Sequence, residues 1–322
     1  MTQRRIYAFN GDADGLCALQ QLRLAGPGPA TLVTGAKRDI ELLRNVDAST
    51  GDTVVVLDVS LDVNRRHVEA LLARGVFVAY FDHHYAGVIP SAAHFEPHID
   101  ASRDVCTSIL VDRHLAGRHR SWAIVAAFGD GLDAVGRRMA HEAGFDAAAI
   151  AMLARLGTLL NYNAYGHDAV DLHFDPAFVA AEMLPFGDPL AFTRDSRLFA
   201  RLDAAFEDDM IKARAVRPTS ERPGAAIVIL PAEKWARRTI GILANELVSA
   251  RPTSAVAMLV PRTDGGYVVS VRVPPGHPVG ADDFCRGFAS GGGRAQAAGI
   301  NHLAQEDVAR FEAGFLRQFQ LV

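Results

Sequence analysis

Short apolar runs alternate with helical patterns over the first 120 residues, and this alternation allows few architectures. Strand-like runs occur at residues 6–9 (IYAF), 31–35 (TLVTG), 53–58 (TVVVLD) and 76–81 (VFVAYF). Helical patterns lie between them at residues 16–24, near Ile40 and at 62–73. Such alternation is typical of βαβ units that build a parallel sheet. We therefore predict a doubly wound α/β domain, whose ligands bind beyond the carboxyl ends of the strands.

The rest of the chain is divided by a segment rich in Pro, Ser and charge, RPTSERPG at residues 217–224. Alanine-rich helical patterns precede it, whereas strand patterns, one helical pattern and a glycine cluster follow it and indicate a small α+β module. A chain of 322 residues is also longer than the chains that usually fold around a single hydrophobic core, which favours two domains. We expect an α/β domain with a helical extension at 1–194, a helical linker and hinge at 195–222, and an α+β domain at 223–322.

Composition and charge exclude several classes of function. No apolar run approaches the roughly 20 residues that span a bilayer, and the start MTQRRIYAFN lacks a signal-peptide pattern, so we expect a cytoplasmic protein without a membrane partner. The three cysteines are widely spaced and form no zinc or disulfide pattern. With 33 basic and 37 acidic residues the net charge is −4, which argues against coating long nucleic acid and favours a small or terminal phosphate substrate.

Acidic side chains follow three of the predicted strands. They are Asp12 and Asp14 after the first strand, Asp58 after the third, and Asp82 with His83 and His84 after the fourth. A single Asp at a strand end is often only a helix N-cap, but capping does not explain two histidines behind a carboxylate. Because carboxylates brought together resist ionisation, divalent cations are their usual partners. Oxygen and imidazole ligands suit manganese, and two ions about 4 Å apart can hold the attacking and leaving oxygens of a phosphoryl transfer.

Five motifs in order resemble those of the DHH phosphoesterase family. They are GDADG (11–15), LDVS (57–60), FDHH (81–84), FGDG (128–131) and the glycine-rich SGGGRAQAAGI (290–300). The last is similar to the substrate-binding motif of the C-terminal domain associated with that family. The resemblance spans nearly the whole chain and implies a catalytic DHH domain followed by a substrate-binding domain.

The resemblance also implies a ligand set. Asp12, Asp58 and Asp130 would hold one ion and Asp14, Asp58 and His83 the other, with two divalent ions in total, manganese preferred and magnesium the alternative. Asp82 would orient the adjacent imidazoles, and His84 would contact the scissile phosphate. A water bridging the ions would be the nucleophile.

Two residues depart from the family pattern. Asn10 stands where relatives carry Asp or His, so one metal ligand is a neutral amide or is replaced by water. Arg294 follows Gly291, Gly292 and Gly293 where the family has a histidine, and an arginine can still clasp a phosphate that the glycine backbone approaches closely.

Four further basic residues are candidates for nucleotide contact. They are Arg272, Arg238, Lys37 and Arg38. For each, an ordinary solvated charge is an equally good interpretation.

We expect an exonuclease that converts single-stranded DNA or short oligonucleotides to mononucleotides in the cleft between two lobes. A nanoRNase and a phosphodiesterase for cyclic or linear dinucleotides remain alternatives, and a non-catalytic nucleotide-binding module is a different class. The ligand set is intact except at Asn10, which favours catalysis. The sequence leaves homodimer formation open.

Overall fold

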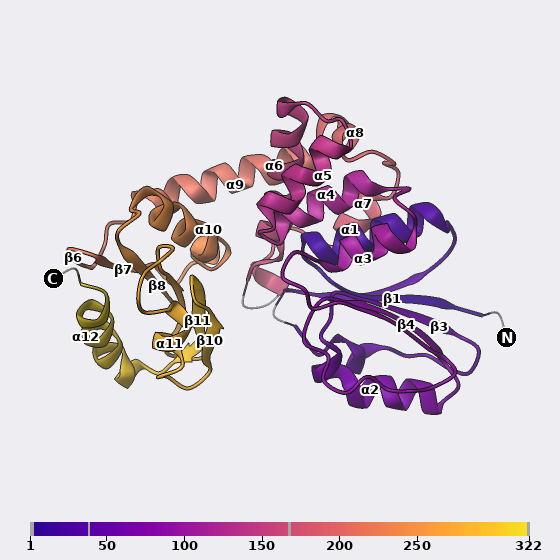
Figure 1. Cartoon of the computed structure of the whole chain (residues 1–322), viewed down its shortest axis with the longest axis horizontal. Helices are drawn as coiled ribbons and strands as arrows, with labels where there is room; N and C mark the ends of the chain where they lie inside the picture. Colours follow the sequence, from indigo (N-terminus) through magenta and orange to yellow (C-terminus); the bar gives the residue numbers. More distant parts are fainter. Residues whose placement is uncertain (1–2, 38, 167–168, 321–322) are drawn as a thin grey trace. The chain divides into compact units, whose positions relative to one another are not determined.

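The computed structural model describes residues 3–37, 39–166 and 169–320 (Figure 1). The chain forms two compact units, Met1–Ala204 and Ala205–Val322. The division falls inside the segment 195–222 that we expected to link two domains, within helix α9 (Arg197–Ala215). None of the helices in the described ranges is long and apolar enough to cross a membrane.

The first unit contains a five-stranded, wholly parallel sheet in the order β2-β1-β3-β4-β5. Its strands are β1 (Arg5–Asn10), β2 (Thr31–Gly35), β3 (Thr53–Leu57), β4 (Phe77–Asp82) and β5 (Phe95–Ile99). The predicted α/β class is confirmed, and β5 is an edge strand that the sequence did not predict. Because the strand order reverses between β1 and β3, the crevice beyond the carboxyl ends of these strands is a topological switch point, where such folds bind ligands.

Helices cover both faces of this sheet (Figure 1). Helix α2 (Leu61–Ala73) and the short 3₁₀ helix η1 (Leu42–Asn45) pack on one face, where alternate strand residues such as Val54, Val56 and Tyr80 form a buried core. Helices α1 (Ala13–Ala25) and α3 (Thr107–His114) lie on the opposite face and pack against each other. The sheet is therefore doubly wound, as the alternation of patterns predicts.

A helical extension packs against α1. It comprises α4 (Arg120–Gly129), α5 (Asp133–Glu142), α6 (Ala147–Ala164), η2 (Ala169–Asp171), α7 (Pro176–Met183) and α8 (Pro189–Asp195). Two glycines allow close contact between these helices: a Cβ added at Gly129 would overlap the Cβ of Ala13, and one added at Gly157 would overlap the carbonyl of Val125. The close contact of α4 with α1 brings Asp130, which follows α4, near the start of α1.

The second unit has a six-stranded mixed sheet in the order β10-β11-β9-β8-β7-β6. Its strands are β6 (Ser220–Arg222), β7 (Ala225–Ile229), β8 (Ala255–Pro261), β9 (Tyr267–Arg272), β10 (Gly291–Arg294) and β11 (Ala297–Leu303). Its helices are α10 (Lys234–Ala250), α11 (Ala281–Cys285), η3 (Gln305–Asp307) and α12 (Val308–Phe319). A core of Phe311, Phe315 and Phe319 from α12 packs around Phe284. The predicted α+β class is confirmed, with part of the Pro- and Ser-rich segment forming strand β6.

Candidate metal centre

Asp12 combines two roles at the carboxyl end of β1. It is the N-cap of α1, because its Oδ1 accepts hydrogen bonds from the backbone N–H groups of Asp14 at 3.0 Å and Gly15 at 3.1 Å. Its Oδ2 lies 2.6 Å from Nζ of Lys37. Burial raises the pKa of Asp12, but the Lys37 ammonium together with the hydrogen bonds from Gly15 and Asp58 holds that pKa below its ordinary value. Capping therefore accounts for only one of the two oxygens.

Asp14 faces the N-terminus of another helix. Its two carboxylate oxygens accept the backbone N–H groups of Thr107 and Ser108, each at 2.7 Å, at the start of α3. The helix dipole favours a negative charge at that position, while burial raises the pKa of Asp14 to about 6. Each oxygen keeps a second lone pair, so both remain available to a cation.

Asp58 adopts a strained backbone at the end of β3. Its φ of +58° lies in the left-handed region, and its N–H donates to the carbonyl of Phe81 at 3.0 Å. Burial raises the pKa of Asp58 well above its ordinary value, and the carboxylates of Asp12, Asp14 and Asp130 raise it further. A non-glycine residue in this conformation, with a carboxyl group that is only 3% exposed, is typical of a functional site.

The imidazole of His83 has one nitrogen fixed and one available. Nδ1 lies 3.1 Å from the carbonyl oxygen of Val105, which can only accept, so this nitrogen carries the proton. Nε2 lies 3.4 Å from Oδ1 of Asp58 and 3.9 Å from carboxylate oxygens of both Asp14 and Asp130. A histidine whose second nitrogen donates to a backbone carbonyl is the usual arrangement of a metal ligand.

A hydrogen bond to Asp82, the last residue of β4, orients His84. Its Nδ1 lies 2.7 Å from Oδ1 of Asp82, whose other oxygen accepts the N–H of Leu61 at 3.4 Å. Burial lowers the pKa of His84, but the hydrogen bond to Asp82 and the negative charges of Asp82, Asp14 and Asp12 together raise that pKa above its ordinary value. The side chain of His84 is 44% exposed. It can therefore offer a proton or a positive charge to a molecule that reaches the site.

The donors near the carboxyl ends of β1, β3 and β4 fit a divalent cation. Three carboxylates, of Asp14, Asp58 and Asp130, lie around the imidazole of His83. Asp58, His83 and His84 place three ligand atoms within 4.8 Å of one another. The Oδ1 of Asn10, at the end of β1, is buried and has no hydrogen-bond partner among the described residues. An unpaired buried amide oxygen, two residues before Asp12 in the chain, would be satisfied as a ligand of a cation. The Asp and His residues predicted to be ligands are thus brought together, with Asn10 at the neighbouring strand end.

The basic residues predicted to contact substrate have different surroundings. Lys37 lies at the candidate metal centre, since its Nζ contacts Asp12 and donates to Oδ1 of Asn161 at 3.1 Å. Arg272 bonds Asn245 at 2.6 Å and Ser270 at 3.0 Å. Arg294 is exposed at the end of β10. Arg38 lies outside the described residues.

Arg238 has a partner that favours a structural role. It is buried, and it contacts Oδ2 of Asp209 through Nε at 2.8 Å and Nη2 at 2.6 Å. A buried arginine in a two-point ion pair with a carboxylate stabilises its own unit. Substrate contact by Arg238 therefore gains no support from its surroundings.

The three glycines of the predicted substrate motif are not equivalent. A Cβ at Gly291 would overlap the carbonyl of Cys285, and Gly293 has a φ of +146° with Ala298 beside it. Packing of β10 therefore requires glycine at both positions. At Gly292 an added Cβ would have no described atom within 4 Å, so only this backbone faces open space.

Sequence reasoning did not find the groups that orient the ligands. The N–H groups of Thr107 and Ser108, the carbonyl of Val105 and the amide of Asn161 all contact residues of the centre. Because every residue has a backbone carbonyl and almost every residue a backbone N–H, residue types do not reveal which of these groups orient a ligand. For Asn161 the signal would have been a polar residue near the end of α6, but its partner is 124 positions away.

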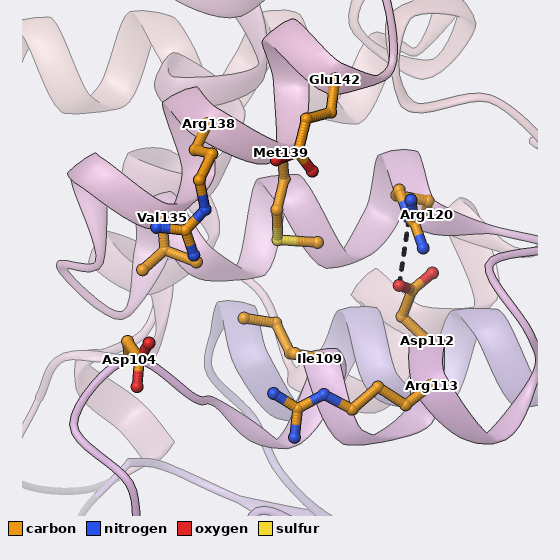
Figure 2. A pocket seen from close by; sticks show the side chains of 9 residues that line it. All are labelled: Asp104, Ile109, Asp112, Arg113, Arg120, Val135, Arg138, Met139 and Glu142. Carbon is orange, nitrogen blue, oxygen red and sulfur yellow. Dashed lines mark hydrogen bonds and ion pairs between the residues drawn. The ribbon is translucent and has the colours of Figure 1, made fainter.

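A separate pocket of about 210 Å³ lies among α3, α4 and α5 (Figure 2). Arg113, Arg120 and Arg138 line it together with the acidic Asp112 and Glu142. The Nε of Arg120 donates to Asp112 at 3.2 Å, so part of this charge is already neutralised. None of the metal-centre residues lines this pocket.

Solved structures match this chain along nearly its whole length, whereas no family model and no curated protein sequence matches it. The exonuclease RecJ bound to manganese gives a TM-score of 0.63 at 18% identity, over 97% of this chain and 89% of RecJ. A DHH domain from a member of a family of ribosomal proteins gives 0.67 at 15% identity, over 99% and 88%. The pGpG-specific phosphodiesterase PggH from Vibrio cholerae gives 0.59 at 13% identity, over 98% and 99%.

Fold and site together define an α/β protein with a carboxylate and histidine centre at the switch point of its sheet. In particular, the chain has the fold of the RecJ and DHH-domain structures. The likeness that the motifs predict is therefore confirmed at the level of the fold.

Proposed function

We propose that this protein is a DHH-type, metal-dependent phosphodiesterase that acts on the ends of single-stranded DNA or on short oligonucleotides and releases mononucleotides. One observation carries the proposal: Nε2 of His83 faces the carboxylates of Asp14, Asp58 and Asp130 at 3.4–3.9 Å. This donor set suits a hard divalent ion such as manganese or magnesium. The fold is shared with a RecJ exonuclease bound to manganese.

The residues of the centre have distinct roles in this proposal. Asp14, Asp58 and His83 hold one ion, while Asp12, Asp58 and Asp130 with Oδ1 of Asn10 hold a second. When bound, the ions lower the pKa of a coordinated water and withdraw charge from the phosphoryl group. Asp82 orients His84, whose raised pKa lets it donate a hydrogen bond to a phosphate oxygen.

Two features support a small or terminal substrate over a long duplex. The net charge of −4 leaves few cations for simultaneous backbone contacts, so affinity should depend only weakly on salt. In the second unit, the open backbone of Gly292 and the exposed Arg294 offer one phosphate-binding position. A protein that holds one remote phosphate and one scissile phosphate suits a strand end.

The test is a manganese-supplemented assay with DNA and RNA labelled at either end, from dinucleotides to 30-mers. Circular single-stranded DNA, blunt duplex and cyclic dinucleotides of matched sequence complete the substrates. We expect mononucleotides from linear strands and no cleavage of the circle. Cutting of the circle, or equal rates on duplex and single strand, would contradict the proposal, and activity confined to dinucleotides would favour the dinucleotide phosphodiesterase class.

Two aspartate variants test whether hydrolysis depends on the candidate metal centre. Asp58→Asn keeps the size of the residue but removes a carboxylate shared by both ions, so hydrolysis should fall by about a thousandfold or more. Asp62→Asn changes an exposed aspartate of α2 that pairs with Arg65, and should leave hydrolysis unchanged.

A further inference from the structure

A second cluster of metal-ligating side chains lies at the edge of the first sheet. Glu96 and His98 stand on edge strand β5, two residues apart and so on the same face, and His114 is the last residue of α3. One ligand atom from each lies within 4.8 Å of the other two. The cluster shares no residue with the centre formed by Asp58, His83 and His84.

The two imidazoles are held in place by an aromatic side chain. Phe81 is directly opposite His98 in the β4–β5 register, and their rings stack with centroids 4.2 Å apart and an angle of 6° between planes. The His114 ring stands edge-on to both, with centroids 5.2 Å from Phe81 and 4.9 Å from His98. Since Phe81 is buried, both imidazoles pack against a side chain that is fixed in position. Ligands fixed by packing lose little entropy when they bind an ion.

The chemistry of the three donors selects one class of ion. Two imidazoles and one carboxylate, with a position left for water, are the protein ligands of many zinc sites, whereas magnesium and calcium favour all-oxygen sets. Oε1 of Glu96 already lies 2.7 Å from Nε2 of His98. Within the described ranges, no lysine or arginine pairs with Glu96 and competes for it. The Glu96 side chain is 46% exposed, so it can rotate to close the set around an ion.

We propose that Glu96, His98 and His114 bind a zinc-class divalent ion at a site separate from the DHH centre. The ion ties the edge strand β5 to the C-terminal end of α3. The N-terminal end of the same helix holds Asp14 through the N–H groups of Thr107 and Ser108. Occupancy should therefore stabilise the first unit and the helix that orients a ligand of the DHH centre.

The test measures zinc binding directly in a parent protein that carries Asp58→Asn and His83→Ala, so that the DHH centre does not contribute. Glu96→Gln and His98→Phe remove a ligand while keeping size, and the phenylalanine preserves the stack on Phe81. His141→Gln, at an exposed histidine of α5, is the matched control. Zinc affinity is measured by competition with a chromophoric chelator, and cobalt absorption reports the coordination number.

We expect one zinc per chain in the parent and in the His141 control, with affinity reduced at least tenfold in Glu96→Gln and His98→Phe. Zinc should also raise the melting temperature of the parent but not of the two ligand variants. Equal affinity and stoichiometry in all four proteins would overturn the proposal. Because the measurement involves no substrate, it succeeds or fails independently of the proposed hydrolysis.

Discussion

The ammonium of Lys37 lies 2.6 Å from Oδ2 of Asp12, although Asp12 is a predicted metal ligand. Burial lowers the pKa of Lys37, but Asp12, with smaller contributions from Tyr165 and Asp130, raises the pKa well above its ordinary value, so the lysine stays charged. A divalent ion bound through this oxygen must displace the lysine or lie beside its charge. We therefore expect Lys37 to oppose metal binding, and we propose that its ammonium binds a substrate phosphate when one is present.

Lys37→Met should change two affinities in opposite directions. Removing the ammonium should tighten manganese binding by about tenfold, equivalent to about 1.4 kcal/mol, because a partly exposed charge is screened by solvent. The Michaelis constant for oligonucleotide should rise, since the proposed phosphate contact is lost. Titration calorimetry with manganese and steady-state kinetics measure the two effects.

Lys212→Met is the matched control for Lys37→Met, because this lysine is exposed and pairs with Asp208 on α9. It should leave both affinities unchanged. Weaker manganese binding in Lys37→Met would show instead that the lysine supports the arrangement of the ligands.

The carboxyl ends of the strands of a parallel sheet lie at the same side of the sheet. The positions of Asp12, Asp58 and Asp82 could therefore be predicted from the order of strands and helices. Strand β5 could not be predicted, since FEPHI carries a proline and two polar residues, a pattern tolerated at an edge but typical of a loop. The Asp14–Thr107 bond joins residues 93 positions apart through a backbone group. The contact of Lys37 with Asp12 likewise depends on the path of the chain after β2, which residue types do not determine.

Manganese affinity should depend on pH through the carboxylates. Burial raises the pKa of Asp14 to about 6, and protons compete with the ion for this oxygen. Affinity should therefore rise from pH 5 to pH 7 and level off above it. Calorimetric titrations across this range measure the effect, and a constant affinity would exclude titration of a ligand.

The metal-free protein should show the opposite dependence in its stability. Between about pH 4, where the unfolded carboxyl titrates, and about pH 6, the folded Asp14 binds more protons than the unfolded one. The free energy of unfolding contributed by this group should then fall as pH rises. Denaturant melts with chelator present should show this fall, and Asp14→Asn should reduce it.

Arg294→Ala should raise the Michaelis constant more than it lowers the turnover number. The arginine is exposed at the end of β10 and is proposed to bind a remote phosphate, which contributes equally in the ground and transition states. Arg317→Ala, at an exposed arginine of α12, is the control and should change neither constant. Loss of turnover with an unchanged Michaelis constant would place Arg294 among the reacting groups.

Gly129→Ala should weaken metal binding without altering any ligand. An added Cβ would overlap the Cβ of Ala13 and approach the carbonyl of Gly157, so α4 must move away from α1. Asp130 directly follows α4, and Asp12 and Asp14 lie at the start of α1, so this movement separates carboxylates that should share the ions. Overpacking of this kind costs about 1–3 kcal/mol of stability.

Gly187→Ala is the matched control, because its Cβ would meet no described atom within 4 Å. Thermal melts and manganese titrations of the two variants test the prediction, which fails if Gly129→Ala lowers stability but keeps the manganese affinity of the control.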